Sequence, residues 1–210
     1  MAYDFKKECK ELYLPSKKPG IIMVPPMNYL SVRGSGDPNE DGGAYKQAIE
    51  LLYGVAYAIK MSKKGTRRIE GYFDFVVPPL EGFWWQEGIH GVDYAHKEGF
   101  EWMSLIRLPD FVTAEDIEWA KNEASAKKGR DFNKVEFFGY DEGLCVQCMH
   151  VGPYDDEPET VEAMHAFIEA EGFVLDITDV RHHHEIYLGD VRKVVPEKLR
   201  TVVRHPIRCV

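Results

Sequence analysis

The sequence lacks a long hydrophobic run, and this absence argues against a membrane-spanning protein. No stretch among its 210 residues approaches the ~18 uninterrupted apolar residues of a transmembrane helix. The first eight residues have no apolar segment after a basic one, so we expect no secretory signal peptide. Cysteine is scarce, with four residues, which in a chain without such a signal indicates reduced thiols and a cytoplasmic location.

An excess of basic residues is also lacking. The formal net charge is −9 and the isoelectric point is about 5.4. Nucleic acid and anionic membrane surfaces would be repelled by this charge, so we expect neither as a partner. A hydrophobic and cationic small molecule would be tolerated or mildly attracted.

Motifs for nucleophilic hydrolysis and for phosphate binding are missing. The sequence contains no Gly-x-Ser-x-Gly elbow and no zincin motif, which makes a nucleophile-based hydrolase an unfavoured interpretation. Gly34-Ser35-Gly36 precedes an expected helix but lacks the dinucleotide spacing and a lysine for phosphate, so it is interpreted as a turn.

Two local clusters resemble metal or redox sites, and we expect neither to be one. Cys145 and Cys148 are three residues apart in an expected strand, where their side chains point to opposite faces and remain thiols. Within His182-His183-His184 only the first and third histidines share a strand face, and no further ligand is indicated. We therefore expect no metal and no cofactor.

What the sequence does contain is a repeated order of elements around an ordinary core. Hydrophobic residues make up 44% of the chain, and aromatic residues make up 12%. Alternating and helical apolar patterns, broken by glycine and proline, predict strands at 21–24, 27–33, 72–77, 100–108, 134–140, 144–151, 182–188 and 199–207, and helices at 44–60, 113–128 and 158–171. The order strand–strand–helix–strand–strand thus occurs twice.

This repeat predicts an α+β fold of two duplicated units. Residues 1–17 form an N-terminal arm, and 18–210 form the domain. Unit one covers about 20–108 and unit two about 134–208. The bridge at 113–128 begins with Thr113-Ala114-Glu115-Asp116, which resembles a capping box.

The stretch from His182 to Asp190 carries the most informative pattern. Strand alternation places Ile186 and Leu188 on one face and His183, Glu185 and Tyr187 on the other. A solvated sheet face would explain the polar set, and so would a pocket floor.

Alignment of the two units favours the pocket. It sets Tyr72, Asp74 and Val76 beside the polar set of 182–190. The apolar phase of each unit is then expected under its helix, and the mixed phases are expected to face each other across a cleft.

These residues resemble a known family. His184-Glu185-Ile186-Tyr187-Leu188-Gly189-Asp190, preceded by the turn Gly152-Pro153-Tyr154, is similar to the gyrase-inhibitor-like (GyrI-like) small-molecule-binding domain over about residues 18–208. The resemblance implies two tandem strand–helix–strand–strand units in pseudo-twofold arrangement with a ligand pocket between them. In that pocket Glu185 faces a lipophilic, often cationic ligand, and aromatic rings stack on it.

The family includes drug-responsive transcription regulators, a gyrase inhibitor and stand-alone proteins, some of which hydrolyse cyclopropane-bearing DNA alkylators. This chain lacks DNA-binding helices and adds the bridge and an aromatic segment, Phe83-Trp84-Trp85, expected on a loop or edge. Those departures favour the stand-alone, detoxifying type. The leading hypothesis is a hydrolase that opens an activated cyclopropane. The alternatives are a drug-binding module that sequesters or senses drugs, and a gyrase-interacting protein.

The candidate site residues follow from strand phase and resemblance. Glu185 is the expected general base or cation partner, and Tyr187 the expected donor to a developing oxyanion. For each aromatic candidate, core packing is the competing role. The expected ligand-binding residues are Trp84, Trp85, Tyr57, Tyr72, Trp102, Phe132, Tyr140 and His183.

Overall fold

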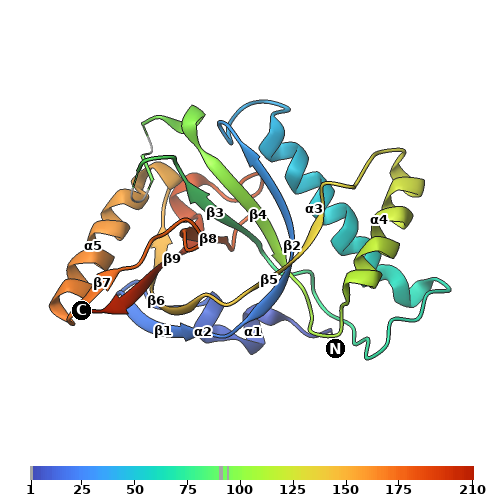
Figure 1. Cartoon of the computed structure of the whole chain (residues 1–210), viewed down its shortest axis with the longest axis horizontal. Coiled ribbons are helices and arrows are strands. Elements are labelled where there is room, and N and C mark those ends of the chain that lie inside the picture. The colour runs from blue at the N-terminus through green and yellow to red at the C-terminus, as the bar shows by residue number, and fades with distance from the viewer. Residues whose placement is uncertain (1, 90–91, 94) are drawn as a thin grey trace.

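A computed structural model describes residues 2–89, 92–93 and 95–210 of the chain. Over these residues it has five α-helices and nine β-strands (Figure 1). The helices are α1 (Phe5–Glu8), α2 (Lys10–Tyr13), α3 (Ala44–Met61), α4 (Ala114–Lys128) and α5 (Glu157–Ala170). The strands are β1 (Gly20–Val24), β2 (Met27–Ser35), β3 (Leu80–Trp85), β4 (Glu101–Arg107), β5 (Glu136–Tyr140), β6 (Gly143–Val151), β7 (Phe173–Leu175), β8 (His183–Tyr187) and β9 (Arg200–Cys209).

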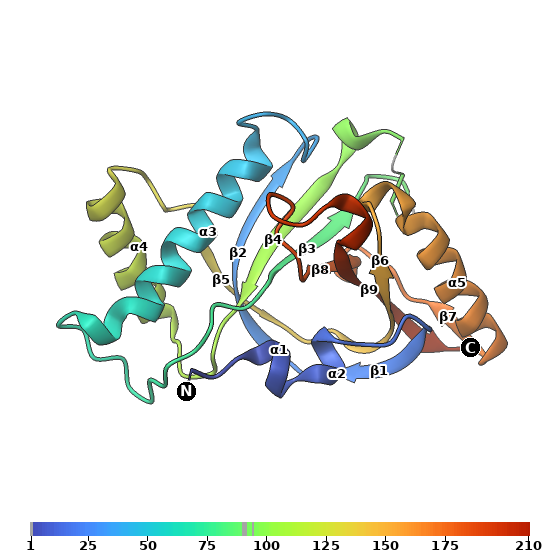
Figure 2. The same ribbon diagram turned by 180° about the vertical axis from the view of Figure 1, so that it is seen from behind.

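All the strand pairings of the sheet are antiparallel. The strands follow the order β1-β6-β9-β8-β3-β4-β2-β5, and β7 also pairs with β9. Figure 1 shows α5 at one end of the molecule and α3 with α4 at the other, with strands between them. Seen from behind in Figure 2, α1 and α2 run along one edge beside β1. The α+β class predicted from the sequence is therefore confirmed.

The two halves of the sheet repeat each other. The series β2-α3-β3-β4 and β6-α5-β8-β9 have the same order, and their strands meet as β6-β9-β8 against β3-β4-β2, with β3 paired to β8 at the centre. The first strand of each half is exchanged, because β1 pairs with β6 and β5 pairs with β2. The duplicated arrangement is the predicted one, and the exchange was not predicted.

The third strand of the first half lies later in the chain than predicted. Residues 72–77 form an extended loop in which Phe75 only bridges Tyr3, and β3 begins after Pro78-Pro79. The aromatic alternation of this loop has another cause, because Tyr72 and Phe75 pack against Phe111. Strand β3, not 72–77, is the counterpart of β8. The expected alignment of Tyr72, Asp74 and Val76 with the β8 residues is therefore wrong.

Helices α3 and α4 follow their predicted patterns. In α3, Leu51, Leu52 and Val55 are buried along one stripe, and this helix packs on β2 and β4. Thr113 and Asp116 form the expected capping box at the start of α4, and Gly129 ends that helix with a positive φ of 61°. No helix of the described residues is long and apolar enough to cross a membrane.

The four cysteines are free in the structure. Cys145 belongs to the larger core cluster, and Cys148 packs with Met164 of α5 in the smaller one. Their side chains therefore leave β6 on opposite faces, as strand alternation predicts. The expectation of separate thiols is confirmed.

A buried charged network fastens the N-terminal arm to the sheet. Arg204 of β9 donates to Glu142 over 2.9 Å and to the carbonyl of Leu12 over 2.9 Å. The other oxygen of Glu142 accepts from His184 over 2.9 Å, and Glu81 lies 3.1 Å from the second nitrogen of His184. Because these side chains are nearly inaccessible to water, each charge depends on its partners.

The network sets opposite pKa shifts on its two ends. Burial opposes ionisation of Glu142, but His184 and Arg204 outweigh it and lower the pKa of this carboxyl. Burial likewise opposes protonation of His184, but Glu142 and Glu81 outweigh it and raise its pKa. Both groups are therefore held in their charged forms.

Replacing Arg204 should test how much the fold depends on this network. Arg204→Met leaves Glu142 buried with one cationic partner removed, so we expect the free energy of unfolding in urea to fall by about 3–5 kcal/mol. Arg192→Met is the matched control, because Arg192 is 82% exposed and its pair with Asp190 is screened by solvent. Equal stability of the two variants would contradict the structural role of Arg204.

A second test uses pH. Because the pKa of His184 is raised in the folded protein, its contribution to stability is complete below the unfolded value of about 6.5 and is lost as pH rises through the folded value. Between about pH 6 and pH 9 the wild type should therefore lose stability relative to His184→Gln. If the unfolding free energies of the wild type and His184→Gln change with pH in the same way across this range, the network does not keep His184 protonated.

Candidate functional site

Strand β8 has two unlike faces, as its alternation predicts, but its polar face is the one that meets the helices. Val203 of β9 lies opposite Glu185 and packs against Met164 of α5. Ile186 lies on the other face with His184. The expectation that the apolar phase packs under the helix is wrong, because the N-terminal arm buries that face separately.

The central pair of strands builds the floor of the candidate site. Gly82 of β3 lies opposite Glu185, and Trp84 lies opposite His183. The indole Nε1 of Trp84 donates a 2.9 Å hydrogen bond to the hydroxyl of Tyr187. A Cβ on Gly82 would come within 2.8 Å of that Nε1 and 3.2 Å of that hydroxyl. Glycine at this position therefore leaves room for the Trp84–Tyr187 contact beside Glu185.

Two further tyrosines border the carboxylate. Tyr45, in the first turn of α3, packs against Trp84 with ring centroids 5.1 Å apart. Tyr154, just before α5, meets Tyr187 edge to face with centroids 5.7 Å apart. Burial raises the pKa of both Tyr45 and Tyr154, and the nearby charge of Glu185 adds to each shift. Aromatic rings from both halves of the fold therefore lie near Glu185.

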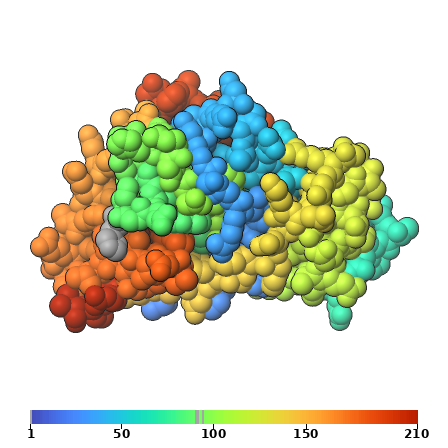
Figure 3. Space-filling model, turned by 45° about the horizontal axis from the view of Figure 1, so that its top comes forward, coloured from blue at the N-terminus to red at the C-terminus, as the bar shows by residue number. Residues whose placement is uncertain are grey.

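These rings lie where the two halves meet. Figure 3 shows the green segment around β3 and β4 against the orange segment of α5. Lys97, between β3 and β4, pairs with Asp155, just before α5, over 2.6 Å. Glu185 is 6% exposed, and Tyr187, Tyr45 and Tyr154 are partly exposed.

A row of histidines leads away from Glu185. Its Oε1 lies 3.0 Å from Nε2 of His183, and Nδ1 of His183 lies 2.6 Å from Nε2 of His205 in β9. Nδ1 of His205 in turn lies 3.1 Å from Nε2 of His165 in α5. Burial lowers the pKa of His205 well below its ordinary value, and His183 and His165 add to this shift. His205 is therefore neutral at physiological pH.

Glu157, the first residue of α5, completes the acidic part of the site. Glu157, His183 and Glu185 are buried, and one ligand-type atom of each lies within 4.8 Å of the others. Three such donors could approach a cation. His183, however, uses both ring nitrogens in hydrogen bonds, and a metal on its Nε2 would displace the contact with Glu185. The arrangement is better suited to moving a proton than to holding a metal.

Tyr187 is protonated, as a hydrogen-bond donor must be. Burial raises its pKa well above the ordinary value, and the charge of Glu185 adds to the shift, so the phenol stays protonated. Its oxygen accepts from Trp84, and its hydroxyl also forms a hydrogen bond with Tyr45, so a bound molecule would take the place of Tyr45 as the partner of the phenol proton. A carboxylate and a phenol donor thus lie side by side on one sheet face.

The structure brings together some of the residues predicted from the sequence. Glu185, Tyr187, His183 and Trp84 form one group on β3 and β8. Trp102 adjoins it from β4, opposite Trp84, and packs edge to face on Tyr45 with centroids 5.2 Å apart. Trp84 and Trp85 lie in a central strand, and the expected loop or edge position was wrong.

Other predicted ligand-binding residues lie elsewhere. Trp85 and Tyr140 are on the opposite sheet face, where Trp85 stacks on His182 and Tyr140 packs on Phe83. Phe132 is buried beneath α3, against Gly54.

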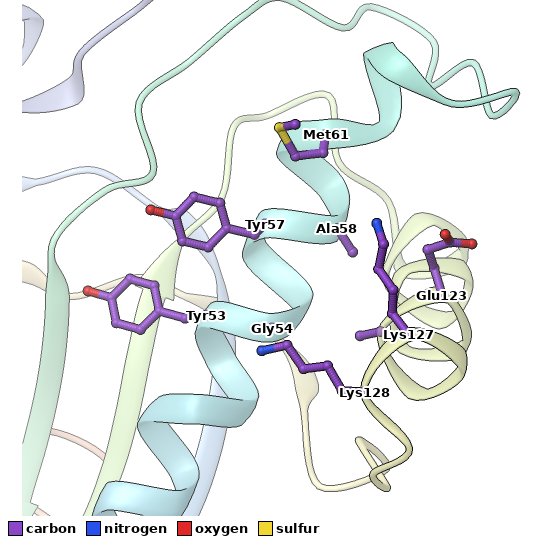
Figure 4. Close-up of a pocket in the computed structure, with 9 residues that line it drawn as sticks. Tyr53, Gly54, Tyr57, Ala58, Met61, Glu123, Lys127 and Lys128 are labelled. Carbon is purple, nitrogen blue, oxygen red and sulfur yellow. The ribbon is translucent and has the colours of Figure 1, made fainter.

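The last two candidates belong to other surroundings. The hydroxyl of Tyr72 donates to the carbonyl of Lys60 near the end of α3. Tyr57 lines a hollow of about 430 Å³ between α3 and α4 (Figure 4). Neither contacts the group around Glu185.

Several residues of the site were missed by sequence reasoning. Glu157, Tyr45, His165 and His205 were not predicted, and Tyr154 was noted only as part of a turn. Of these, His205 could have been found, because strand alternation in β9 relative to β8 fixes its face once the two strands are known to pair. The helical residues required the position of α3 and α5 over the sheet.

Comparison with known proteins gives full-length matches. An uncharacterized conserved protein from Listeria innocua is 51% identical, with a TM-score of 0.92 over 98% of this chain and 100% of that one. A hydrolase from Listeria innocua is 48% identical, with a TM-score of 0.89 over 98% of this chain and 100% of that one.

A more distant solved structure agrees in fold alone. The C-terminal domain of EcmrR is 13% identical, with a TM-score of 0.58 over 92% of this chain and 98% of that one. No curated protein matches the sequence. The model of the GyrI-like small-molecule-binding domain matches residues 17–208. With nearly the whole chain covered, this protein belongs to the family of GyrI-like small-molecule-binding domains.

Proposed function

We propose that this protein binds a flat hydrophobic molecule beside Glu185 and hydrolyses it, with cyclopropane-bearing DNA alkylators as the substrate class. The observation that carries the proposal is the pairing of the Glu185 carboxylate with the protonated Tyr187 phenol inside a border of aromatic rings. The hydrolase from Listeria innocua, 48% identical over nearly the whole chain, supports a hydrolytic reaction.

The proposed substrate is a cyclopropane conjugated to a dienone. Water attacks a ring methylene, one ring C–C bond breaks, and its electron pair moves through the dienone to give a phenolate. The ring is already electrophilic, so the protein has to orient it, place a water molecule and stabilise the developing oxyanion. Positioning and acid–base help of ~10²–10⁴-fold are sufficient contributions for such a reaction.

The residues divide these tasks. Glu185 accepts a proton from the attacking water, and Tyr187 donates its hydrogen bond to the developing oxyanion, with its orientation held by Trp84. Tyr45, Tyr154, Trp84 and Trp102 offer flat rings to a planar ligand. Because Glu185 is nearly inaccessible to water, its charge acts more strongly on a ligand than a surface carboxylate would.

The same group of side chains could instead retain a ligand without turnover, as a sequestering module does. A cyclohexadienone with a spiro-fused cyclopropane separates the two functions, because its opening by water gives a phenol with a distinct absorption. With protein at substoichiometric concentration, many equivalents of phenol per protein support the hydrolase. Loss of one equivalent or fewer overturns it in favour of sequestration.

Replacing Glu185 tests its role directly. Glu185→Gln keeps the shape but removes the basic oxygen, so turnover of the spiro-fused probe should fall by roughly 10²-fold or more. Unfolding free energy should stay within about 1–2 kcal/mol of the wild type, and neutral planar ligands should still bind.

The matched control is Glu169→Gln, which removes an exposed carboxylate from the last turn of α5 and should leave turnover unchanged. Full turnover by Glu185→Gln would show that Glu185 is not the base. Equal losses in both variants would point to the overall negative charge instead.

A further inference from the structure

We propose that His183, His205 and His165 form a proton relay between Glu185 and solvent at the partly exposed His165 of α5. The inference deepens the proposed function and rests on Glu185 taking a proton from water. The three histidines do not react with the substrate themselves. They remove the proton from Glu185, so that it becomes a carboxylate again. His183 comes from β8, His205 from β9 and His165 from α5.

The contacts form one unbroken chain. The successive distances from Glu185 to His183, His205 and His165 are 3.0, 2.6 and 3.1 Å, all within hydrogen-bond range. Each link uses a different nitrogen, so His183 and His205 each accept on one side and donate on the other. His165 is partly exposed, while the two inner histidines are buried.

Neutral imidazoles are what such a chain needs. If each histidine carries one proton, two polarities satisfy all three bonds: every proton on Nε2, or every proton on Nδ1. Burial lowers the pKa of His205 and of His165, and the proximity of His183 lowers both further. The charged or titratable groups facing the chain are Glu157 and Glu162 of α5 and Glu185 itself.

The proton count balances in both directions. In the outward run each histidine starts with its proton on Nδ1. Glu185 gives its proton to Nε2 of His183, Nδ1 of His183 gives one to His205, Nδ1 of His205 gives one to His165, and Nδ1 of His165 releases one to solvent. All three rings then carry the proton on Nε2, and Glu185 is a carboxylate. An inward run of one proton restores the first polarity and protonates Glu185 again. That proton then passes to the phenolate of the product by way of the Tyr187 hydroxyl, so Glu185 is a carboxylate for the next turnover.

The relay would matter because a bound ligand blocks direct proton exchange between Glu185 and solvent. The carboxylate is 6% exposed and bordered by aromatic rings, so a bound planar ligand would cover it from solvent. A relay along this face of the sheet to α5 keeps the carboxylate in proton exchange with solvent while the ligand is in place.

The first test needs no substrate. In the protein with ¹⁵N-labelled histidine rings, NMR should find His165 and His205 neutral, with couplings across the N–H···N bonds of the chain. Glu185→Gln removes the charge that fixes the polarity, so the tautomer populations of His205 and His165, which do not touch Glu185, should change. A change confined to His183 would overturn the relay.

The second test uses turnover of the spiro-fused cyclopropane probe. His165→Ala should lower kcat by at least about tenfold with little change in KM, within the ~10²–10⁴-fold scale of proton-transfer catalysis. Imidazole in the buffer should restore it, because free imidazole can accept the proton at the vacated position. His205→Phe cuts the chain in its buried middle, so it should lose activity without rescue.

The matched control is His150→Ala. His150 is a buried histidine that bonds Thr160 and the carbonyl of Pro153 rather than the relay, so imidazole should not alter its turnover. Wild-type activity in His205→Phe, or rescue of all variants alike, would overturn the relay, and so would turnover that EDTA abolishes. If the wild type does not open the probe at all, the proposed function fails, and the NMR measurement still decides whether the histidines are coupled.

Discussion

The antiparallel pairing of β3 with β8 is the contact on which the rest of the structure depends. It joins the two halves at the centre of the sheet and fixes which side chains face each other: Gly82 opposite Glu185, Trp84 opposite His183. A shift by one residue would move Glu185 to the opposite face, among the charged network of the N-terminal arm. The geometry of the candidate site is therefore a property of strand register and not of loop conformation.

Adjacent residues of β8 serve two separate polar systems. His184 points into a network with Glu142 and Glu81 in which charges are fixed by ion pairing. His183 points to the other face and joins neutral imidazoles that end at Glu185. One histidine is held protonated by its ion pairs, and the other belongs to the proposed relay. Strand alternation alone produces this division of roles.

Much of the fold was predictable from the sequence because local patterns agree with the tertiary structure. The repeat, the α3 stripe, the Thr113 capping box and the phase of β8 followed from apolar spacing and capping chemistry. Strand β3 was missed because it follows two prolines and contains Gly82, both unfavourable signals for a strand interior. Glycine is present there because of a contact with Trp84 and Tyr187.

The site was predictable only where one strand supplied it. Glu185, Tyr187 and His183 share a face of β8, and period-two spacing is enough to group them. Tyr45, Glu157 and His165 reach the same place from helices, which depends on how α3 and α5 lie over the sheet. The aromatic residues chosen by abundance alone were spread over both faces because aromatic side chains also fill cores.

The exchange of β1 and β5 restricts how a ligand can enter. Three strand pairings join the halves: β1–β6, β3–β8 and β5–β2. Neither half can therefore rotate away from the other without breaking a ladder of backbone hydrogen bonds. A ligand that binds beside Glu185, as proposed, would therefore enter by rotation of the side chains around that carboxylate. The partly exposed rings of Tyr45, Tyr154 and Tyr187 stand there, and an aromatic ring turns far faster than a sheet opens.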